Sequence, residues 1–196
     1  MRVSLRLAAA AAIFAGFLAA CSMDDPSNRF AQLTYQHLPD INLDVAEIQI
    51  EQAYVTPGQP PNVDHLFPVQ PKDAAVRWAQ DRLVARGDRL IFRYIVREAS
   101  AVETALPVSG GITGMVTTDQ SERYELHLVV EMQILDGRQI QGTAKAEARR
   151  SLTVPEDSSL KEREQVWYRL TEQTMRDLDQ QLEQTIREAF FPYIVL

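Results

Sequence analysis

The sequence contains very little cysteine and histidine. Of its 196 residues only Cys21 is a cysteine, and the three histidines are His37, His65 and His127. A single cysteine forms neither an internal disulfide nor a cysteine metal cluster. The chain also lacks a Gly-x-Ser-x-Gly motif, a phosphate-binding glycine loop and a His-Glu-x-x-His motif. The sequence therefore predicts a protein that is not an enzyme and that binds no cofactor.

Positive charge is scarce, and so are long apolar runs after residue 20. The chain has 20 Lys and Arg against 27 Asp and Glu, a net charge of −7. Because residues 1–20 hold two arginines and no acid, the remainder carries about −9. Nucleic-acid binding needs a basic patch, and none is visible, so we expect no nucleic-acid partner. Hydrophobic residues make up 45% of the chain, enough for the core of one domain.

The first 20 residues follow the pattern of a secretory signal peptide. Arg2 and Arg6 precede an apolar run of about 14 residues that ends in small side chains, whereas roughly 20 residues are needed to cross a bilayer. The segment Leu18-Ala19-Ala20-Cys21 resembles a bacterial lipobox. The resemblance implies removal of residues 1–20, a diacylglycerol on the Cys21 thiol and acylation of the new amino terminus, for example with palmitate. The alternatives are an ordinary signal peptide that contains a cysteine and an uncleaved anchor.

A lipid at this position would hold the protein on a membrane. Each buried methylene contributes about 0.8 kcal/mol, and one acyl chain holds only marginally, whereas two or three chains hold firmly. Ser22 rather than aspartate follows the cysteine, which resembles the outer-membrane address of the best-known bacterial sorting rule. We therefore expect anchoring to the outer membrane, on the periplasmic side, with the inner membrane as the alternative. Residues 21–40 are expected to be the lipidated tether.

Residues 41–196 are expected to form one α+β domain. The hydrophobic pattern predicts strands and helices in the order β-α-β-β-β-α, which corresponds to an antiparallel sheet of about four strands covered on one face by two helices. The C-terminal helix is long, about 30 residues, and begins at Ser159 with a capping-box glutamate three residues later. The expected strands are 41–54, 90 to about 106, 124–134 and 140 onward, and the first helix is 71–86.

A row of small side chains predicts how the long helix packs. Gly142, Ala144, Ala146 and Ala148 share one face of the last strand, so a helix can approach this strand closely. Trp78 and Trp167 are expected in the core, and the acidic face of the long helix is expected to be solvated.

The order of elements resembles two families of envelope lipoproteins in Gram-negative bacteria. Val76-Arg77-Trp78-Ala79, followed by Arg82-Leu83, is similar to the Trp-Ala segment of the auxiliary lipoproteins of lipid-transport ABC systems. The strand from Tyr124 to Leu135, a polar turn, a second strand and a long helix resemble the lipopolysaccharide-assembly lipoprotein that plugs an outer-membrane barrel. Neither family has catalytic residues. The resemblance implies an accessory lipoprotein that binds a transport or outer-membrane assembly partner, or a lipid.

Two apolar segments are candidate contacts for such a partner or lipid, because exposed apolar patches often mark binding sites. Ile112, Met115 and Val116 lie in a glycine-rich loop, and Phe191 and Tyr193 lie in the aromatic tail. The loop residues can instead fold onto the sheet edge, and the tail can instead cover the open end of the core.

A second hypothesis is a metal-binding protein or an enzyme that uses the strand 122–135. Glu125, His127 and Glu131 share one face of this strand, and alternate residues on one face converge, so the three side chains suit a metal ion. A solvated sheet face explains the same pattern without a metal. The oligomeric state stays open, because an uncovered sheet edge can pair with another copy.

Overall fold

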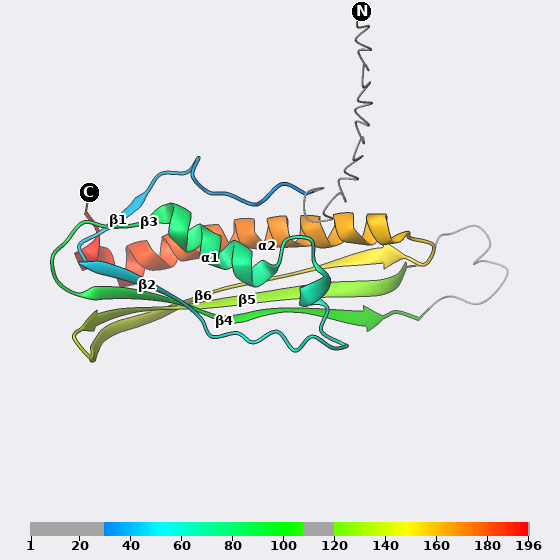
Figure 1. Cartoon of the computed structure of the whole chain (residues 1–196), viewed down its shortest axis with the longest axis horizontal. Helices are drawn as coiled ribbons and strands as arrows, with labels where there is room; N and C mark the ends of the chain where they lie inside the picture. Colours follow the sequence, from blue (N-terminus) through cyan, green and yellow to red (C-terminus); the bar gives the residue numbers. More distant parts are fainter. Residues whose placement is uncertain (1–29, 108–119, 196) are drawn as a thin grey trace, which may run out of the picture.

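The computed structural model describes residues 30–107 and 120–195. Both helices lie on one side of the main sheet, and the opposite side carries no helix in this part of the chain (Figure 1). We refer to this second side as the open face of the sheet. The regular elements are β1 (Ile41–Leu43), β2 (Glu47–Gln52), η2 (Asp64–Leu66), α1 (Pro71–Arg82), β3 (Leu83–Ala85), β4 (Ile91–Ala105), β5 (Gln120–Asp136), β6 (Gln139–Pro155), α2 (Leu160–Ala189) and η4 (Phe191–Tyr193).

The main sheet has four strands in the order β2-β4-β5-β6, and it is mixed. The expected four strands and two helices are confirmed, but the expectation of a wholly antiparallel sheet is wrong. β2 pairs with β4 in parallel, whereas β4 with β5 and β5 with β6 pair antiparallel. The reason is the connection, since β2 and β4 are joined through α1, and a crossover through a helix returns the chain in the same direction.

A second, two-stranded sheet divides the expected strand 41–54. β1 pairs in parallel with β3, and residue Ile194 of the C-terminal tail bridges to Leu43 on its other side. The backbone between β1 and β2 turns at Asp44, and β2 then joins the main sheet. The helix expected to reach residue 86 ends at Arg82, because the next three residues extend to pair with β1.

The residues of β4 that point into the core are even-numbered in its first half and odd-numbered in its second half. Phe92, Tyr94 and Val96 point into the core, but after them Ala99 and Ala101 do so. The register with β5 shifts between Val96 and Glu98, which leaves Arg97 as the extra residue of a bulge. Arg97 is therefore added to the open face without breaking the core row.

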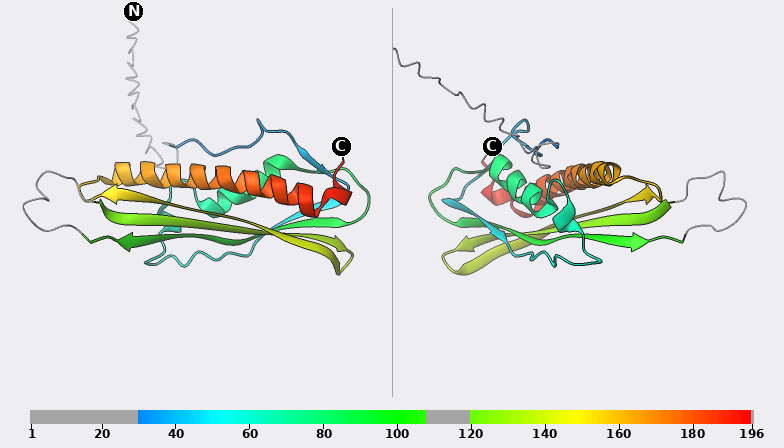
Figure 2. Two further views of the ribbon diagram at one scale, coloured as in Figure 1. Left: turned by 180° about the vertical axis from the view of Figure 1, so that it is seen from behind. Right: turned by 45° about the vertical axis from the view of Figure 1, so that its right-hand side comes forward.

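The long helix α2 packs mainly on β6, as the row of small residues predicted. Ser159 caps it in a capping box with Glu162, and a Cβ on Gly142 would lie 3.6 Å from the Phe190 ring. The buried stripe of α2 fills the space over the sheet with Val166, Trp167, Leu170, Met175, Leu178, Leu182 and Ile186. Residues 30–40, which we call the strap, run along the outer side of α2 before β1 (Figure 2).

Candidate functional site

The structure describes only part of the sites expected from the sequence. Cys21, the signal peptide and the loop residues Ile112, Met115 and Val116 lie outside the described residues. Phe191 is 65% exposed, whereas Tyr193 is partly buried against the core. The backbone carbonyl of Tyr193 accepts a hydrogen bond from the Asp44 amide at 2.8 Å, so the tail closes one end of the domain while it leaves the Phe191 ring on the surface.

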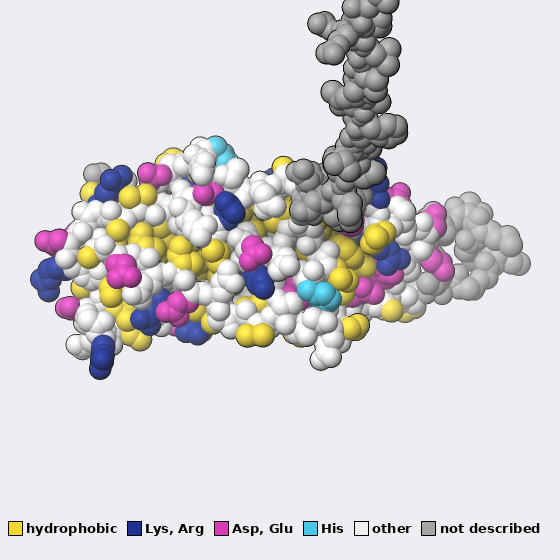
Figure 3. Space-filling model, in the orientation of Figure 1, with side chains coloured by type: hydrophobic (Ala, Val, Ile, Leu, Met, Phe, Trp, Pro, Cys, Tyr) yellow, Lys and Arg dark blue, Asp and Glu magenta, His cyan; other side chains and the backbone are white. Residues whose placement is uncertain are grey.

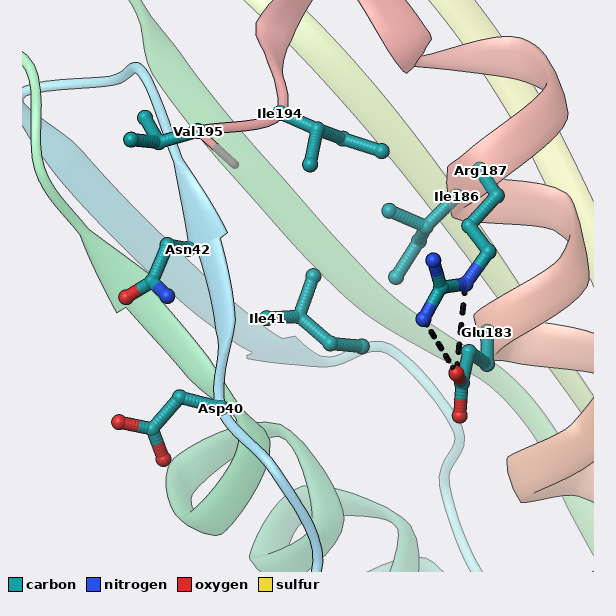
Figure 4. Close-up of a pocket in the computed structure, with 8 residues that line it drawn as sticks. All are labelled: Asp40, Ile41, Asn42, Glu183, Ile186, Arg187, Ile194 and Val195. Carbon is teal, nitrogen blue, oxygen red and sulfur yellow. Dashed lines mark hydrogen bonds and ion pairs between the residues drawn. The ribbon is translucent and has the colours of Figure 1, made fainter.

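A small pocket lies beside this tail, between β1 and the last turns of α2 (Figure 4). Its volume is about 170 Å³. Apolar and charged side chains share its wall, and Glu183 and Arg187, one turn apart on α2, form an ion pair at 2.7 Å along the helix side of the pocket (Figure 4). The lining residues are Asp40, Ile41, Asn42, Glu183, Ile186, Arg187, Ile194 and Val195. Because pockets for drug-sized ligands measure about 300–1,000 Å³, this hollow suits one side chain of a partner better than a whole lipid chain.

A buried polar cluster joins α1 to α2. Trp78 of α1 donates its indole N–H to Asp179 of α2 at 2.6 Å, and Arg82 of α1 donates to Glu183 at 2.9 Å. Trp78 is fully buried and Arg82 is 1% exposed. The pKa of Glu183 is lowered, first by the hydrogen bond from Arg187 and further by the charge of Arg82. The expectation of a solvated acidic face is therefore wrong for Asp179 and Glu183, because they neutralise and position the α1 side chains.

The strap docks on the same pair of helices. The carboxylate of Asp81 accepts hydrogen bonds from the backbone amide of Tyr35 at 2.8 Å, from the Thr34 hydroxyl at 3.1 Å and from the side-chain amide of Gln36 at 3.3 Å. The Tyr35 side chain is buried, and burial together with nearby Asp179 raises the pKa of its phenol. The strap is thus an integral layer of the fold, whereas the sequence suggested a tether up to residue 40.

The open face of the sheet carries ion pairs between neighbouring strands. Arg97 contacts Glu131 at 3.1 Å, and this hydrogen bond lowers the pKa of Glu131. His127 contacts Glu147 at 2.8 Å, and Arg149 lies 3.5 Å from Glu125. The three side chains proposed as metal ligands are therefore each engaged by a different neighbour. Within residues 30–107 and 120–195, no three His, Cys, Asp or Glu side chains are grouped to hold a metal ion.

The surface shows no large region of one charge in the view of Figure 3, where acidic and basic side chains are interspersed with apolar ones. In the described part of the chain, no helix is both long enough and apolar enough to cross a membrane.

The two edges of the main sheet differ. The outer edge of β4 is covered by β2 and, farther along, by Asn62 and Val63, which pair with Val102 and Ala101. β6 forms the other edge of the sheet. Two paired strands lie about 4.8 Å apart, whereas packed helices need 8–10 Å. Because α2 lies over β6, antiparallel pairing of the β6 strands of two copies would bring their helices into collision on one side of the sheet, which disfavours this antiparallel dimer.

Comparisons with known proteins find distant likeness in solved structures alone. No protein-family model matches the chain, and no curated protein matches it. Rare lipoprotein B of Shewanella oneidensis is 19% identical, with 70% of this chain and 92% of that one covered and a TM-score of 0.35. A minor lipoprotein of Acinetobacter baumannii is 17% identical over 70% and 93% of the chains (TM-score 0.32), and a Xanthomonas campestris protein is 10% identical over 80% and 90% (TM-score 0.33). Likeness at this distance assigns neither a family nor a function.

Sequence reasoning missed the Trp78–Asp179 and Arg82–Glu183 contacts. One signal was available, because Ala74, Ala75, Trp78, Ala79 and Arg82 recur at helical spacing and are the buried positions of α1. A buried arginine within an apolar stripe needs an acidic partner to compensate its charge. The sequence alone does not show which acid of α2 is that partner.

Proposed function

We propose that this chain is a lipid-anchored, non-enzymatic accessory protein of the bacterial cell envelope that binds a protein partner of a transport or outer-membrane assembly system. The observation that carries the proposal is the segment Leu18-Ala19-Ala20-Cys21, which resembles a lipobox and ends nine positions before Phe30, where the strap begins. Acylation at Cys21 would keep the domain on the membrane, and Ser22 favours the outer membrane.

Packing supports a protein partner over a lipid held between sheet and helix. Leu170, Leu178 and Leu182 are fully buried between α2 and the sheet, and Ala146 and Ala148 of β6 lie beneath the helix. A lipid chain could enter only if α2 moved away from the sheet, because these side chains already fill the space between them. A partner protein can instead use the exposed tail residue Phe191 or the polar open face of the sheet.

The first test is chemical. Cells that express the whole chain are fed an alkyne fatty acid, and the purified protein is analysed by mass spectrometry. We expect a labelled amino-terminal Cys21 with the first 20 residues removed, and no label on Cys21→Ala. An unmodified Cys21 in the mature protein would overturn the anchor and, with it, this function.

The second test concerns partner and location. Crosslinking in intact cells, followed by mass spectrometry, is expected to join the wild type to a transport or assembly component, and Cys21→Ala is expected to lose that product. Membrane fractionation is expected to find the wild type with the outer membrane and Ser22→Asp with the inner membrane. A wild type without any crosslinked envelope component would contradict the accessory role.

A further inference from the structure

The charges of α2 are divided between its sides. Three of its acids face neighbouring elements, since Asp177 pairs with Arg150 of β6 while Asp179 and Glu183 serve α1. Two further acids lie exposed at the two ends of the helix, where Glu162 belongs to the capping box and Glu188 accepts a hydrogen bond from Gln184. The remaining acids are Glu164 and Glu172, both partly buried, and Glu172 pairs with Arg176.

Between its exposed end acids Glu162 and Glu188, the solvent side of α2 is basic and polar, although the protein as a whole is acidic. The exposed positions between these two acids contain three cations and four glutamines. Two of the cations are paired within the helix, Arg176 with Glu172 and Arg187 with Glu183. We call Lys161 and six of these seven residues the outer ridge of α2, which comprises Lys161, Gln165, Arg169, Arg176, Gln180, Gln184 and Arg187. The adjacent strap contains no acid from residue 30 to residue 39.

The start of the strap places the membrane anchor on this side. The Phe30 ring packs on Tyr168 of α2, with ring centroids 5.2 Å apart. Eight residues separate Phe30 from Cys21, and the nine steps along the chain span at most about 30 Å. α2 itself is about 45 Å long. A lipid on Cys21 therefore enters the bilayer close to the helical side, and the open face of the sheet lies behind it.

We propose that the outer ridge of α2 rests on the membrane surface, where its cations contact anionic phospholipid headgroups, and that the open face of the sheet is turned away from the membrane toward the periplasm. The inference rests on the lipid anchor of the proposed function and adds an orientation to it. Basic residues close to an anionic lipid surface are attracted to it, and the attraction weakens as salt increases. The orientation leaves Arg97, Arg149 and the other exposed charges of the open face accessible to a protein partner.

Energy transfer can measure this orientation. Because the lipid occupies the sulfur of Cys21, one introduced cysteine gives the lipidated protein a single free thiol. A donor dye is placed at Gln180→Cys on the ridge or at Thr143→Cys on the open face, both exposed positions in the same half of the domain. The protein is reconstituted in vesicles of phosphatidylethanolamine and phosphatidylglycerol that contain an acceptor-labelled lipid. We expect more transfer from position 180, and equal or greater transfer from position 143 overturns the orientation.

Charge variants test the cause with a matched control. Arg169→Gln/Arg176→Gln removes two cations from the ridge, and Lys145→Gln/Arg149→Gln removes two from the open face. Each ridge arginine lost is expected to lower the occupancy of this orientation about fivefold, from about 1 kcal/mol per basic residue near an anionic surface. The transfer from position 180 should fall in the ridge variant and stay unchanged in the open-face variant. Equal effects of the two pairs would show that the ridge does not contact the lipid headgroups.

The two proposals fail in different ways. A mature protein without lipid on Cys21 overturns the function and the orientation together. A lipidated protein whose open face lies nearer the acceptor overturns the orientation alone, because the anchor and the accessory role do not depend on which side faces the bilayer.

Discussion

Trp78 donates its indole N–H to the carboxylate of Asp179 at 2.6 Å, and the two residues are 101 positions apart in the sequence. One turn farther along α1, Arg82 contacts Glu183 in the same way. α1 follows the parallel strand β2, and α2 covers the antiparallel part of the sheet. These contacts therefore join the two halves of the helical layer, and the strap that leads to the anchor docks on them through Asp81.

The indole bond can be tested with the chain's two tryptophans. Trp78→Phe removes a buried hydrogen bond to a charged group, worth about 1.5–3 kcal/mol. Trp167→Phe is the matched control, because the Trp167 indole N–H is buried without a hydrogen-bond partner in the described structure. Urea unfolding should show a larger loss of stability for Trp78→Phe by about that amount. Equal losses would mean that the Trp78 bond contributes nothing beyond packing.

The effect of Arg82→Met on stability should change sign when the two acidic partners of Arg82 are removed. Arg82 is 1% exposed, and Glu183 at 2.9 Å and Asp179 at 3.8 Å offset its charge. In Asp179→Asn/Glu183→Gln the arginine stays buried without a carboxylate, which costs about 3–5 kcal/mol. In that background Arg82→Met is expected to restore stability, whereas in the wild type it is neutral or destabilising. A double-mutant cycle by denaturant unfolding measures the difference, and Arg82→Met destabilising both backgrounds equally would contradict the coupling.

The sequence predicted the elements better than it predicted their partners. Hydrophobic periodicity located α2, its cap at Ser159 and the row of small residues beneath it, because these depend on local spacing. It did not reveal that β2 runs parallel to β4, since strand direction follows from the crossover rather than from the pattern of either strand. It also extended the first helix through Leu83, where pairing with β1 overrides the helical pattern.

For the candidate site, the limits of sequence reasoning are different. Glu125, His127 and Glu131 do share a face, as alternation requires, but their neighbours on β4 and β6 decide what they contact. Arg97 reaches Glu131 only because a bulge places it on that face. No pattern within the strand 122–135 encodes that partner, so the ion pairs could not be distinguished from metal ligands before the register was known.

The Arg97–Glu131 pair predicts a pH dependence of stability. The hydrogen bond from Arg97 lowers the pKa of Glu131 below its ordinary value of about 4.3. The native state therefore binds this proton less readily than the unfolded state, so the stabilisation is present above about pH 4.3 and is lost as the pH falls through the lowered pKa. Arg97→Gln should reduce the loss of stability between pH 6 and pH 3 in urea titrations.

A control for this pH effect is Arg89→Gln. Arg89 lies 3.8 Å from Asp136, and both side chains are largely exposed, so screening by solvent leaves this pair little influence. An equal change of slope in both variants would assign the effect to net charge rather than to the contact with Glu131.

Two glycines should respond oppositely to the same substitution. A Cβ on Gly87 would lie 2.7 Å from the backbone of Asp44 and Val45, closer than packed atoms can approach, so Gly87→Ala must push β1 and β3 apart. We expect a loss of about 1–3 kcal/mol, as for overpacking in a core. At Gly142 the added Cβ meets the Phe190 ring at 3.6 Å, an ordinary contact. Gly142→Ala is therefore expected to be neutral or to stabilise the protein by about 0.4–1 kcal/mol, because alanine has less freedom in the unfolded chain. Urea unfolding of the two variants checks both signs, and a destabilising Gly142→Ala would show that α2 has no room to accept a methyl group on β6.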